Sequence, residues 1–281
     1  MHRKQLLILL MVLLTPIYSA YSQDKILYKQ VDTVKLFLEV HYPKKMDASK
    51  GYPSVVFFFG GGWISGDRSH FSHHAEYFIK RGLCCFLVDY RTRNKHETTP
   101  FESLKDAKSA IRFIRENAEG FNIDPEKIIA AGGSAGGHLA AATALVEAYN
   151  DETDDLEISC IPNALVLFNP VIDNGPGGYG YDRIGNEYKD FSPLHNLKEG
   201  TPPTIIFLGT EDKLVPVETA EYFQVVTERL GSRCDLKLYE GQGHGFFNYS
   251  NFEYYKQTVL EADKFLQSLG YLMDVPIVNI E

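Results

Sequence analysis

The sequence predicts an α/β domain in which a mostly parallel central sheet is covered by helices on both faces. From residue 51 onward, short apolar runs alternate with longer segments of helical periodicity. Several of the short runs are continuously apolar, as is typical of strands buried on both faces. Before residue 51, apolar and polar residues alternate instead, which favours two antiparallel strands. This order indicates a parallel sheet preceded by an N-terminal antiparallel strand pair.

The predicted elements follow this rhythm along the chain. The antiparallel pair spans 26–31 and 34–41. The helix at 101–117 is predicted because Ala107, Ile111 and Ile114 recur at helical spacing. The other helices are predicted at 70–81, 139–148, 217–230 and 251–269, with Gly270 placed to cap the last one. The later strands are predicted at 55–59, 83–88, 128–131, 164–168, 204–208 and 235–239.

Residues 1–22 have the pattern of a secretory signal peptide. Arg3 and Lys4 precede an apolar run from 6 to 14, and small residues follow before residue 23. The apolar run is too short to span a bilayer as a helix. We therefore expect a secreted or periplasmic protein with no membrane span after cleavage, whose residues 23–281 form a single domain that no linker or repeat divides.

The charge of the chain excludes some classes of partner. The formal net charge is −9 at pH 7, from 28 Lys and Arg and 37 Asp and Glu residues. An acidic protein is a poor binder of nucleic acid or of an anionic membrane surface. The four cysteines show no zinc spacing. His70, His73 and His74 share one helical face, but no carboxylate pattern completes a metal site, so none is predicted.

The segment between the strand at 128–131 and the following helix carries the strongest functional pattern. Gly132-Gly133-Ser134-Ala135-Gly136 matches G-x-S-x-G in a strand–turn–helix context, which is typical of a nucleophile elbow. There the serine hydroxyl is held at a helix N-terminus, where backbone N–H groups favour a developing negative charge. An ordinary glycine-rich turn or a phosphate loop are the alternatives, so other parts of the chain must supply a base and an acid.

Two later loops supply an acid and a base. Asp212 follows the strand at 204–208, and the adjacent Glu211 is the alternative acid. His244 lies between glycines in the loop before the last helix, where it has room to reach a serine. The order Ser134, Asp212, His244 is that of the α/β hydrolases. His138, one turn after Ser134, is expected to pack on the elbow helix rather than act as a base.

Two further segments are expected to border the serine. Three glycines and Trp63 follow the strand at 55–59, so backbone N–H groups there can approach a ligand closely. In the hydrolase plan this loop gives one half of an oxyanion hole, and Ala135 gives the other. The glycine-rich segment 170–197 follows a strand on the catalytic edge and is expected to be a lid insertion, with a passive surface loop as the alternative.

Taken together, these motifs resemble the hormone-sensitive-lipase-like branch of the α/β-hydrolase superfamily, and more closely its bacterial acetyl-xylan and feruloyl esterases. The resemblance covers about 52–269 and includes Asp89-Tyr90-Arg91. Two departures leave the subfamily and substrate open: Phe59 precedes the glycines where the branch usually has a His, and Thr92-Arg93 replaces its usual Leu-Ala-Pro-Glu.

The resemblance implies an α/β-hydrolase fold and a serine carboxylesterase that works through an acyl-enzyme without a cofactor. It maps the roles onto Ser134 (nucleophile), Asp212 (acid), His244 (base), and Gly61, Gly62 and Ala135 (oxyanion donors). The expected substrate is a small-molecule or polysaccharide ester with a short acyl group, bordered by Phe59, Trp63, Tyr179 and Tyr181. A serine peptidase and a non-catalytic binding protein on the same fold remain the alternatives.

Overall fold

The computed structural model describes residues 23–47, 49–273 and 280. The predicted signal peptide, residues 1–22, lies outside the described residues. Within them, no helix is long and apolar enough to cross a membrane.

Eight strands form one sheet in the described part of the chain, in the order β1-β2-β4-β3-β5-β6-β7-β8. β1 pairs with β2, and β2 with β4, in antiparallel fashion, whereas the remaining neighbours are parallel. The predicted fold class is thereby confirmed, including the N-terminal antiparallel pair. The strands span Gln23–Val31 (β1), Val34–His41 (β2), Tyr52–Phe58 (β3), Cys84–Val88 (β4), Ile123–Gly133 (β5), Ala164–Phe168 (β6), Thr204–Gly209 (β7) and Cys234–Tyr239 (β8).

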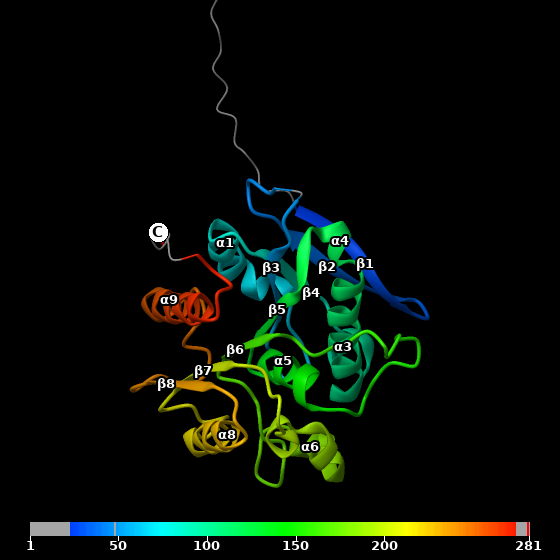
Figure 1. Cartoon of the computed structure of the whole chain (residues 1–281). Helices are drawn as coiled ribbons and strands as arrows, with labels where there is room; N and C mark the ends of the chain where they lie inside the picture. The colour runs from blue at the N-terminus through cyan, green and yellow to red at the C-terminus, as the bar shows by residue number, and fades with distance from the viewer. Residues whose placement is uncertain (1–22, 48, 274–279, 281) are drawn as a thin grey trace, which may run out of the picture.

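Helices cover both faces of this sheet (Figure 1). They span Ser72–Lys80 (α1), Arg93–His96 (α2), Pro100–Glu116 (α3), Ala118–Phe121 (α4), Ala135–Leu145 (α5), Tyr181–Ile184 (α6), Tyr188–Phe191 (α7), Val217–Arg229 (α8) and Phe252–Ser268 (α9). One core joins the sheet to α3, α5 and α8 through residues such as Leu104, Leu139 and Phe223. The other joins it to α1 and α9, for example through Phe78 and Val259.

The helix after the serine begins earlier than predicted, at Ala135 instead of residue 139, and ends at Leu145. The first turn was not predicted because it contains Gly136 and Gly137, and glycine is a poor helix former without an apolar side chain to reveal helical spacing. Packing explains their presence. A Cβ on Gly136 would lie 2.0 Å from the carbonyl oxygen of Phe58. Only glycine therefore lets α5 approach β3 this closely.

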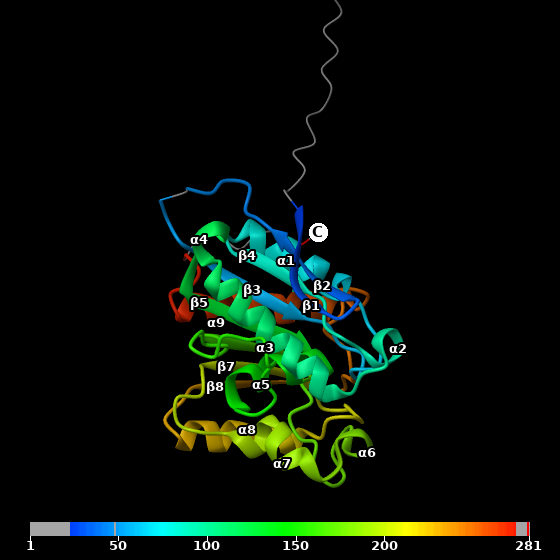
Figure 2. The same ribbon diagram turned by 90° about the vertical axis from the view of Figure 1, so that its right-hand side faces the viewer.

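The segment after β6 is less irregular than its glycine content suggests. It contains α6, α7 and two 3₁₀ turns, Gly185–Glu187 (η2) and Pro193–Asn196 (η3). Figure 2 places α6 at the same end of the sheet as α2, which follows β4. Because the strands before both helices are parallel, this end is the carboxyl edge of the sheet, where ligands of open α/β sheets bind.

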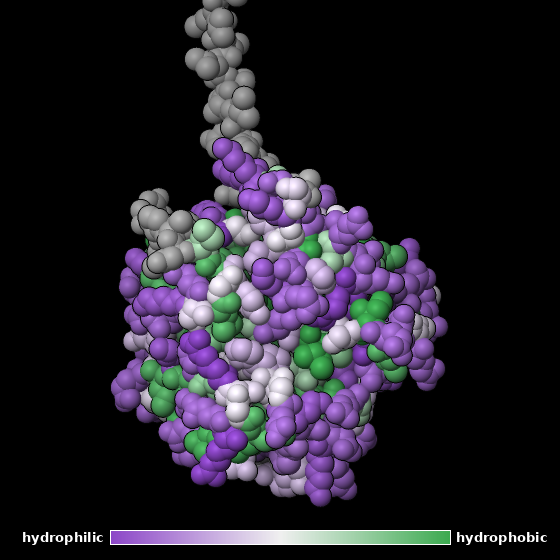
Figure 3. Space-filling view, viewed as in Figure 1, coloured by the Kyte–Doolittle hydropathy of each residue, from purple (hydrophilic) through white to green (hydrophobic). Residues whose placement is uncertain are grey.

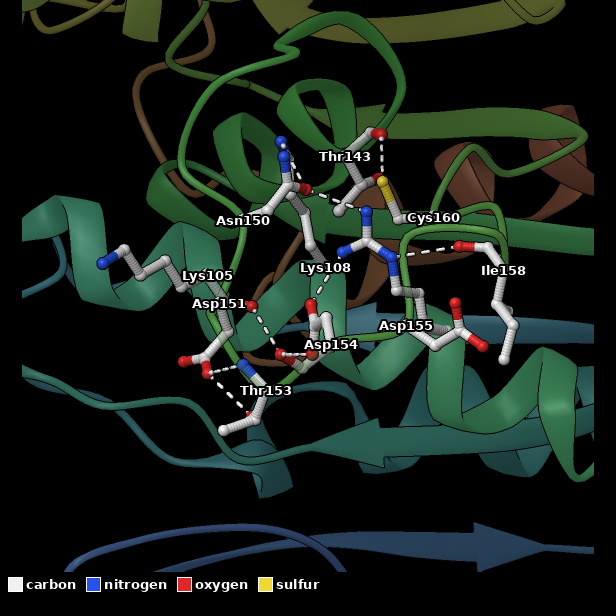
Figure 4. A network of polar contacts seen from close by, with 12 residues as sticks. Lys105, Lys108, Thr143, Asn150, Asp151, Thr153, Asp154, Asp155, Ile158 and Cys160 are labelled. Atoms are coloured by element: carbon white, nitrogen blue, oxygen red, sulfur yellow. Dashed lines mark hydrogen bonds and ion pairs between the residues drawn. The ribbon is translucent and has the colours of Figure 1, made fainter.

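A buried polar network connects α3 to β1 and to the loop after α5, and Figure 4 shows the part at that loop. Lys29 Nζ lies 2.9 Å from Asp106 and 2.7 Å from Asp151. Lys108 donates to the carbonyl oxygens of Glu147 and Ala148. We call this group the α3 network; it comprises Lys29, Asp106, Lys108, Arg112, Asp151 and Asp154.

The surface has no single dominant character on the side shown in Figure 3. Hydrophilic residues prevail there, and apolar residues lie in small separate patches. Scattered apolar residues of this kind are normal on a protein surface.

Candidate active site

Ser134 lies at the turn between β5 and α5, with a strained backbone. Its φ of 55° and ψ of −119° are a conformation that L-residues rarely adopt. Its N–H donates to the carbonyl of Phe168 on β6 (3.0 Å), and its own carbonyl accepts from Val171 and from His138 on α5. The turn is therefore held from the neighbouring strand and from the helix, and the side chain projects from the carboxyl edge.

His244 lies between Ser134 and Asp212. Its Nε2 is 2.8 Å from the Ser134 hydroxyl oxygen, and its Nδ1 is 2.8 Å from Asp212 Oδ2. A carboxylate can only accept, so the ring proton is on Nδ1, and Nε2 is left to accept from the serine hydroxyl. The structure thus brings the three predicted side chains into one hydrogen-bonded chain.

Asp212 is fixed on both of its oxygens. Its side chain is completely buried, and Oδ1 accepts from the N–H groups of Leu214 and Val215 at 2.9 and 3.0 Å. Oδ2 is thereby free to hold His244. The alternative acid, Glu211, is exposed, and it is Asp212 that contacts the histidine.

The structure adds Asn169, which sequence reasoning did not single out. Asn169 follows β6 directly, has a φ of 33° and is completely buried. Its Oδ1 accepts from Gly245 N–H at 3.0 Å, and its Nδ2 lies 3.4 Å from His244 Nε2. It therefore fixes the backbone beside the histidine. The sequence could have indicated Asn169, because it comes directly after the buried strand β6, at the edge where the other site residues lie.

The glycine loop leaves β3 beside the serine turn, because the register of the two strands aligns Phe58 with Gly132. The carbonyl of Gly61 accepts from Ile64 and Ser65 at 3.0 and 3.1 Å. In a trans peptide the N–H points opposite to the carbonyl, so these bonds also set the direction of the Gly62 N–H. Gly61 adopts a φ of 126°, which glycine tolerates best. Ala135 opens α5, where the first N–H groups lack helical partners.

The four predicted substrate residues lie in different surroundings. Phe59 is 3% exposed and stacks on Tyr90 at 4.0 Å between ring centroids, so its side chain supports the glycine loop from the core. Trp63 lines a cavity of about 470 Å³ together with Gly62, Arg93, Pro100 and Arg183. Tyr179 lies 6.1 Å from the Trp63 ring, and Tyr181 lies 6.0 Å from Tyr188.

A second, smaller cavity of about 220 Å³ lies between the insertion and the loop of the acid. Its wall is largely apolar and includes Val171, Ile172, Tyr179, Val215 and Pro216. One residue of this wall, Val171, bonds through its N–H to the Ser134 carbonyl, although no triad residue lines the cavity itself. Tyr179 lines this cavity, and its ring packs near that of Trp63, which lines the larger one.

Arg183 joins the insertion to the glycine loop and was also not predicted. Its Nη1 donates to the carbonyl of Gly62 at 2.5 Å. Its guanidinium lies over the rings of Trp63 and Tyr179, at 5.4 and 5.0 Å from their centroids. Arg183 and Tyr179 of the insertion therefore pack against Gly62 and Trp63 of the glycine loop.

The remaining histidines are separate from the triad. His138 is completely buried, stacks on Phe191 at 4.3 Å, and burial lowers its pKa to about 3. Its ring is therefore neutral and packs under the glycine loop beside Trp63. His73 is partly exposed and His74 is buried, and no group of three or more metal-ligating side chains occurs among the described residues.

Comparison with known protein families divides the chain in two. A family model described as BD-FAE matches residues 38–174. A model described as the prolyl oligopeptidase family matches residues 175–268.

Among solved structures, the chain is similar to esterase 2 of Thermogutta terrifontis. In the form phosphoramylated by tabun, that enzyme is 41% identical to this chain, with a TM-score of 0.87. The match covers 90% of this chain and 97% of the esterase. The propionate-bound form is 40% identical, with a TM-score of 0.85 and the same two coverages.

Curated relatives are more distant and longer. An acetylxylan esterase of Xylanibacter ruminicola is 27% identical over 75% of this chain and 44% of its own length. A probable isoprenylcysteine alpha-carbonyl methylesterase of Arabidopsis thaliana is 26% identical over 81% of this chain and 52% of its own. The chain spans about half the length of these curated relatives.

Proposed function

The chain belongs to the esterase group of the α/β-hydrolase superfamily, and from this membership we propose that it hydrolyses carboxylic esters through Ser134, His244 and Asp212. The observation that carries the proposal is the contact of His244 with both partners at 2.8 Å. That geometry is what proton transfer from a serine to a base requires.

The reaction proceeds in two halves. His244 Nε2 takes the proton of Ser134 as its Oγ attacks the ester carbonyl, and Asp212 stabilises the imidazolium that forms. The N–H groups of Gly61, Gly62 and Ala135 bind the oxyanion, each worth about 3 kcal/mol of barrier. His244 then protonates the departing alcohol. In the second half it activates a water that attacks the acyl-enzyme carbonyl and releases the acid.

We propose a short acyl group. Two observations support it. The wall of the 220 Å³ cavity is mostly apolar and includes Val171, which bonds to the Ser134 carbonyl, and solved structures of the Thermogutta esterase are propionate-bound and butyrate-bound. Because a methylene in an apolar pocket contributes only about 1–3 kcal/mol, discrimination against long chains must come from exclusion by the walls. The insertion at 170–197, which carries Tyr179, covers one side of this cavity as a lid.

For the alcohol side we propose an acylated sugar or polysaccharide. The larger cavity presents polar groups from Arg93, Asn94 and Thr99, which can bond to sugar hydroxyls, while the Trp63 ring in its wall is only 1% exposed. The acetylxylan esterase among the relatives supports the same class. An exported enzyme would meet such polymers, and the pattern of residues 1–22 supports export. The mature N-terminus should then lie near Gln23, and intact Met1 in the natural protein would exclude it.

A peptidase is the second candidate, because the prolyl oligopeptidase model matches residues 175–268. A substrate panel separates the two. We expect kcat/KM on p-nitrophenyl esters to peak at two to four acyl carbons and to fall beyond about eight, with acetate released from acetylated xylan. A maximum at decanoate contradicts the short-acyl pocket. Absence of release from xylan and from feruloylated sugars removes the polysaccharide role, and faster cleavage of peptides than of esters favours the peptidase.

A further inference from the structure

His70 bridges the two loops that flank the serine. It lies in the 3₁₀ turn Arg68–Phe71 (η1) before α1. Its Nδ1 is 3.1 Å from Gly60 N, at the start of the glycine loop. Its Nε2 is 2.6 Å from Asn248 Oδ1, in the loop that carries His244. One imidazole therefore contacts the oxyanion side and the base side of the site.

The donors and acceptors fix the state of this ring. A backbone N–H can only donate, so Nδ1 must accept from Gly60 and carry no proton. The single ring proton of a neutral imidazole then lies on Nε2, where it is donated to Asn248 Oδ1. Burial lowers the pKa of His70, which favours the same neutral form. Protonation would place a second donor against the Gly60 N–H and abolish that bond.

Asn248 continues the connection toward the base. Its Nδ2 donates to the Gly245 carbonyl at 2.8 Å, directly after His244 in the chain. Gly245 N–H in turn donates to Asn169. The oxygen and the nitrogen of the Asn248 amide are thus both engaged inside the protein.

Aromatic packing holds the imidazole in place. Its centroid lies 4.8 Å from the Phe71 ring and 5.7 Å from the Phe247 ring. Phe247 is 1% exposed and Phe71 is fully buried, so both contacts belong to the core. Because the ring is packed on two sides and hydrogen-bonded at both nitrogens, it fixes the distance between the two loops.

We propose that His70 is a positioning residue that sets the distance between the oxyanion loop and the catalytic histidine. It acts through Gly60, whose peptide precedes the donors at Gly61 and Gly62, and through Asn248, which holds the loop after His244. This inference rests on the proposed esterase function. A displacement of about 1 Å at such a site can cost about 100-fold in rate.

The test uses the full chain and dissects the two bonds of the imidazole. His70→Ala removes both. In His70→Asn the amide oxygen can replace Nδ1 as the acceptor for Gly60. In His70→Gln the longer side chain brings an N–H to the place of Nε2 and can donate to Asn248. His73→Ala is the matched control, because that partly exposed ring lies one helical turn away and contacts Glu76 and Tyr249.

We expect His70→Ala to lower kcat for p-nitrophenyl acetate about 10- to 100-fold with KM unchanged within about threefold. Affinity for a short trifluoromethyl ketone, whose hemiketal oxyanion mimics the transition state, should fall by the same factor. Each amide variant should regain part of kcat, and His73→Ala should match wild type. If His70→Ala does not fold, Asn248→Ala takes its place, with about a tenfold loss expected.

Two results would overturn the positioning role. One is a kcat/KM of His70→Ala, or of Asn248→Ala, within about twofold of wild type. The other is a loss of kcat that is proportional to the drop in thermal midpoint, with His70→Asn and His70→Gln no more active than His70→Ala. A wild-type enzyme that hydrolyses no ester at all would instead refute the proposed function, so the two failures are distinguishable.

Discussion

The carboxyl edge of the sheet and the α3 network differ in how they use buried polar groups. In the network the polar side chains are saturated. The Arg112 guanidinium, for example, donates to Asp154, Asn150 and the Ile158 carbonyl. At the edge, one buried carboxylate orients one histidine, and that histidine contacts the partly buried hydroxyl of Ser134. Buried charge by itself therefore marks stability here, whereas a partly exposed nucleophile beside an oriented base marks the candidate site.

Backbone strain is a second feature of the carboxyl edge. Ser134, Trp63 and Asn169 have positive φ values of 55°, 59° and 33°. They follow β5, β3 and β6, which are neighbours in the sheet, so these three residues lie near one another. Positive φ alone does not mark the site, because other turns and loops of the described chain have it too, for example at Tyr149. Such conformations cost about 1–3 kcal/mol each and persist only where the surrounding structure holds them. Local hydrogen bonds hold them here, from Ser134 to β6 and α5 and from Asn169 to Gly245.

The largest effect should come from removing the nucleophile or the base. We expect Ser134→Ala and His244→Ala each to lower kcat for a short-acyl ester by about 10⁶-fold, with similar values because triad members act as a unit. Ser134→Ala should not reduce the free energy of unfolding by more than about 1 kcal/mol, since it deletes only one partly buried hydroxyl.

Covalent labelling checks the assignment directly. A fluorescent phosphonate should label wild type and leave Ser134→Ala unlabelled. Labelling that survives in the alanine variant would show that another residue is the nucleophile.

Removing the charge of the acid should have the next largest effect. In Asp212→Asn the amide can still occupy the pocket, but its N–H would favour the wrong tautomer of His244. We expect kcat to fall by about 10⁴-fold, less than for the serine variant. Single-turnover kinetics would measure the chemical step, and Glu211→Gln, which changes an exposed neighbour, is the matched control. A larger loss in the control would transfer the role to Glu211.

Sequence patterns predicted the features that depend on neighbouring residues, namely the secondary structure and the turn at Ser134. Alternating strands and helices predicted the sheet, and the glycines around Ser134 predicted a turn between strand and helix; both are confirmed by the fold. The backbone strain at Ser134 was not predicted. The side chains of Ser134, Asp212 and His244 meet in the structure, while their catalytic roles remain predictions. The order of loops along a parallel sheet explains why this could be foreseen, because every such loop leaves the same edge.

Contacts between distant segments could not be predicted in this way. His70 and Asn248 are 178 positions apart, and Arg183 and Gly62 are 121 apart. Neither pair carries a spacing or composition signal. The α3 network is similar, since Lys29 on β1 meets Asp106 on α3 only after the sheet has formed. The insertion was also expected to lack periodicity, but tertiary contacts such as those of Arg183 give it short helices.

The network should respond to mutation in stability and not in catalysis. In Arg112→Met the buried carboxylate of Asp154, whose side chain is 8% exposed, loses its cation. Breaking a buried pair from one side typically costs about 3–5 kcal/mol. We expect that loss in the free energy of unfolding, measured by urea denaturation, with kcat per folded molecule unchanged. A selective loss of kcat with unchanged stability would contradict the separation of the two regions.

Lys108 gives the smallest predicted effect, and one that depends on pH. Burial lowers its pKa from 10.5 to about 8, so the cost of burying its charge is fully present below pH 8. Between pH 8 and 10.5 the folded protein releases this proton first, the unfolded chain binds more protons, and stability rises with pH. In Lys108→Met this contribution is absent. The stability of wild type relative to Lys108→Met should therefore increase by about 1–3 kcal/mol between pH 7.5 and 10.5. The comparison removes contributions from other groups that titrate in this range, and urea unfolding at both pH values measures it. A difference that stays constant, or falls, would show that the lysine remains charged among its carbonyl acceptors throughout.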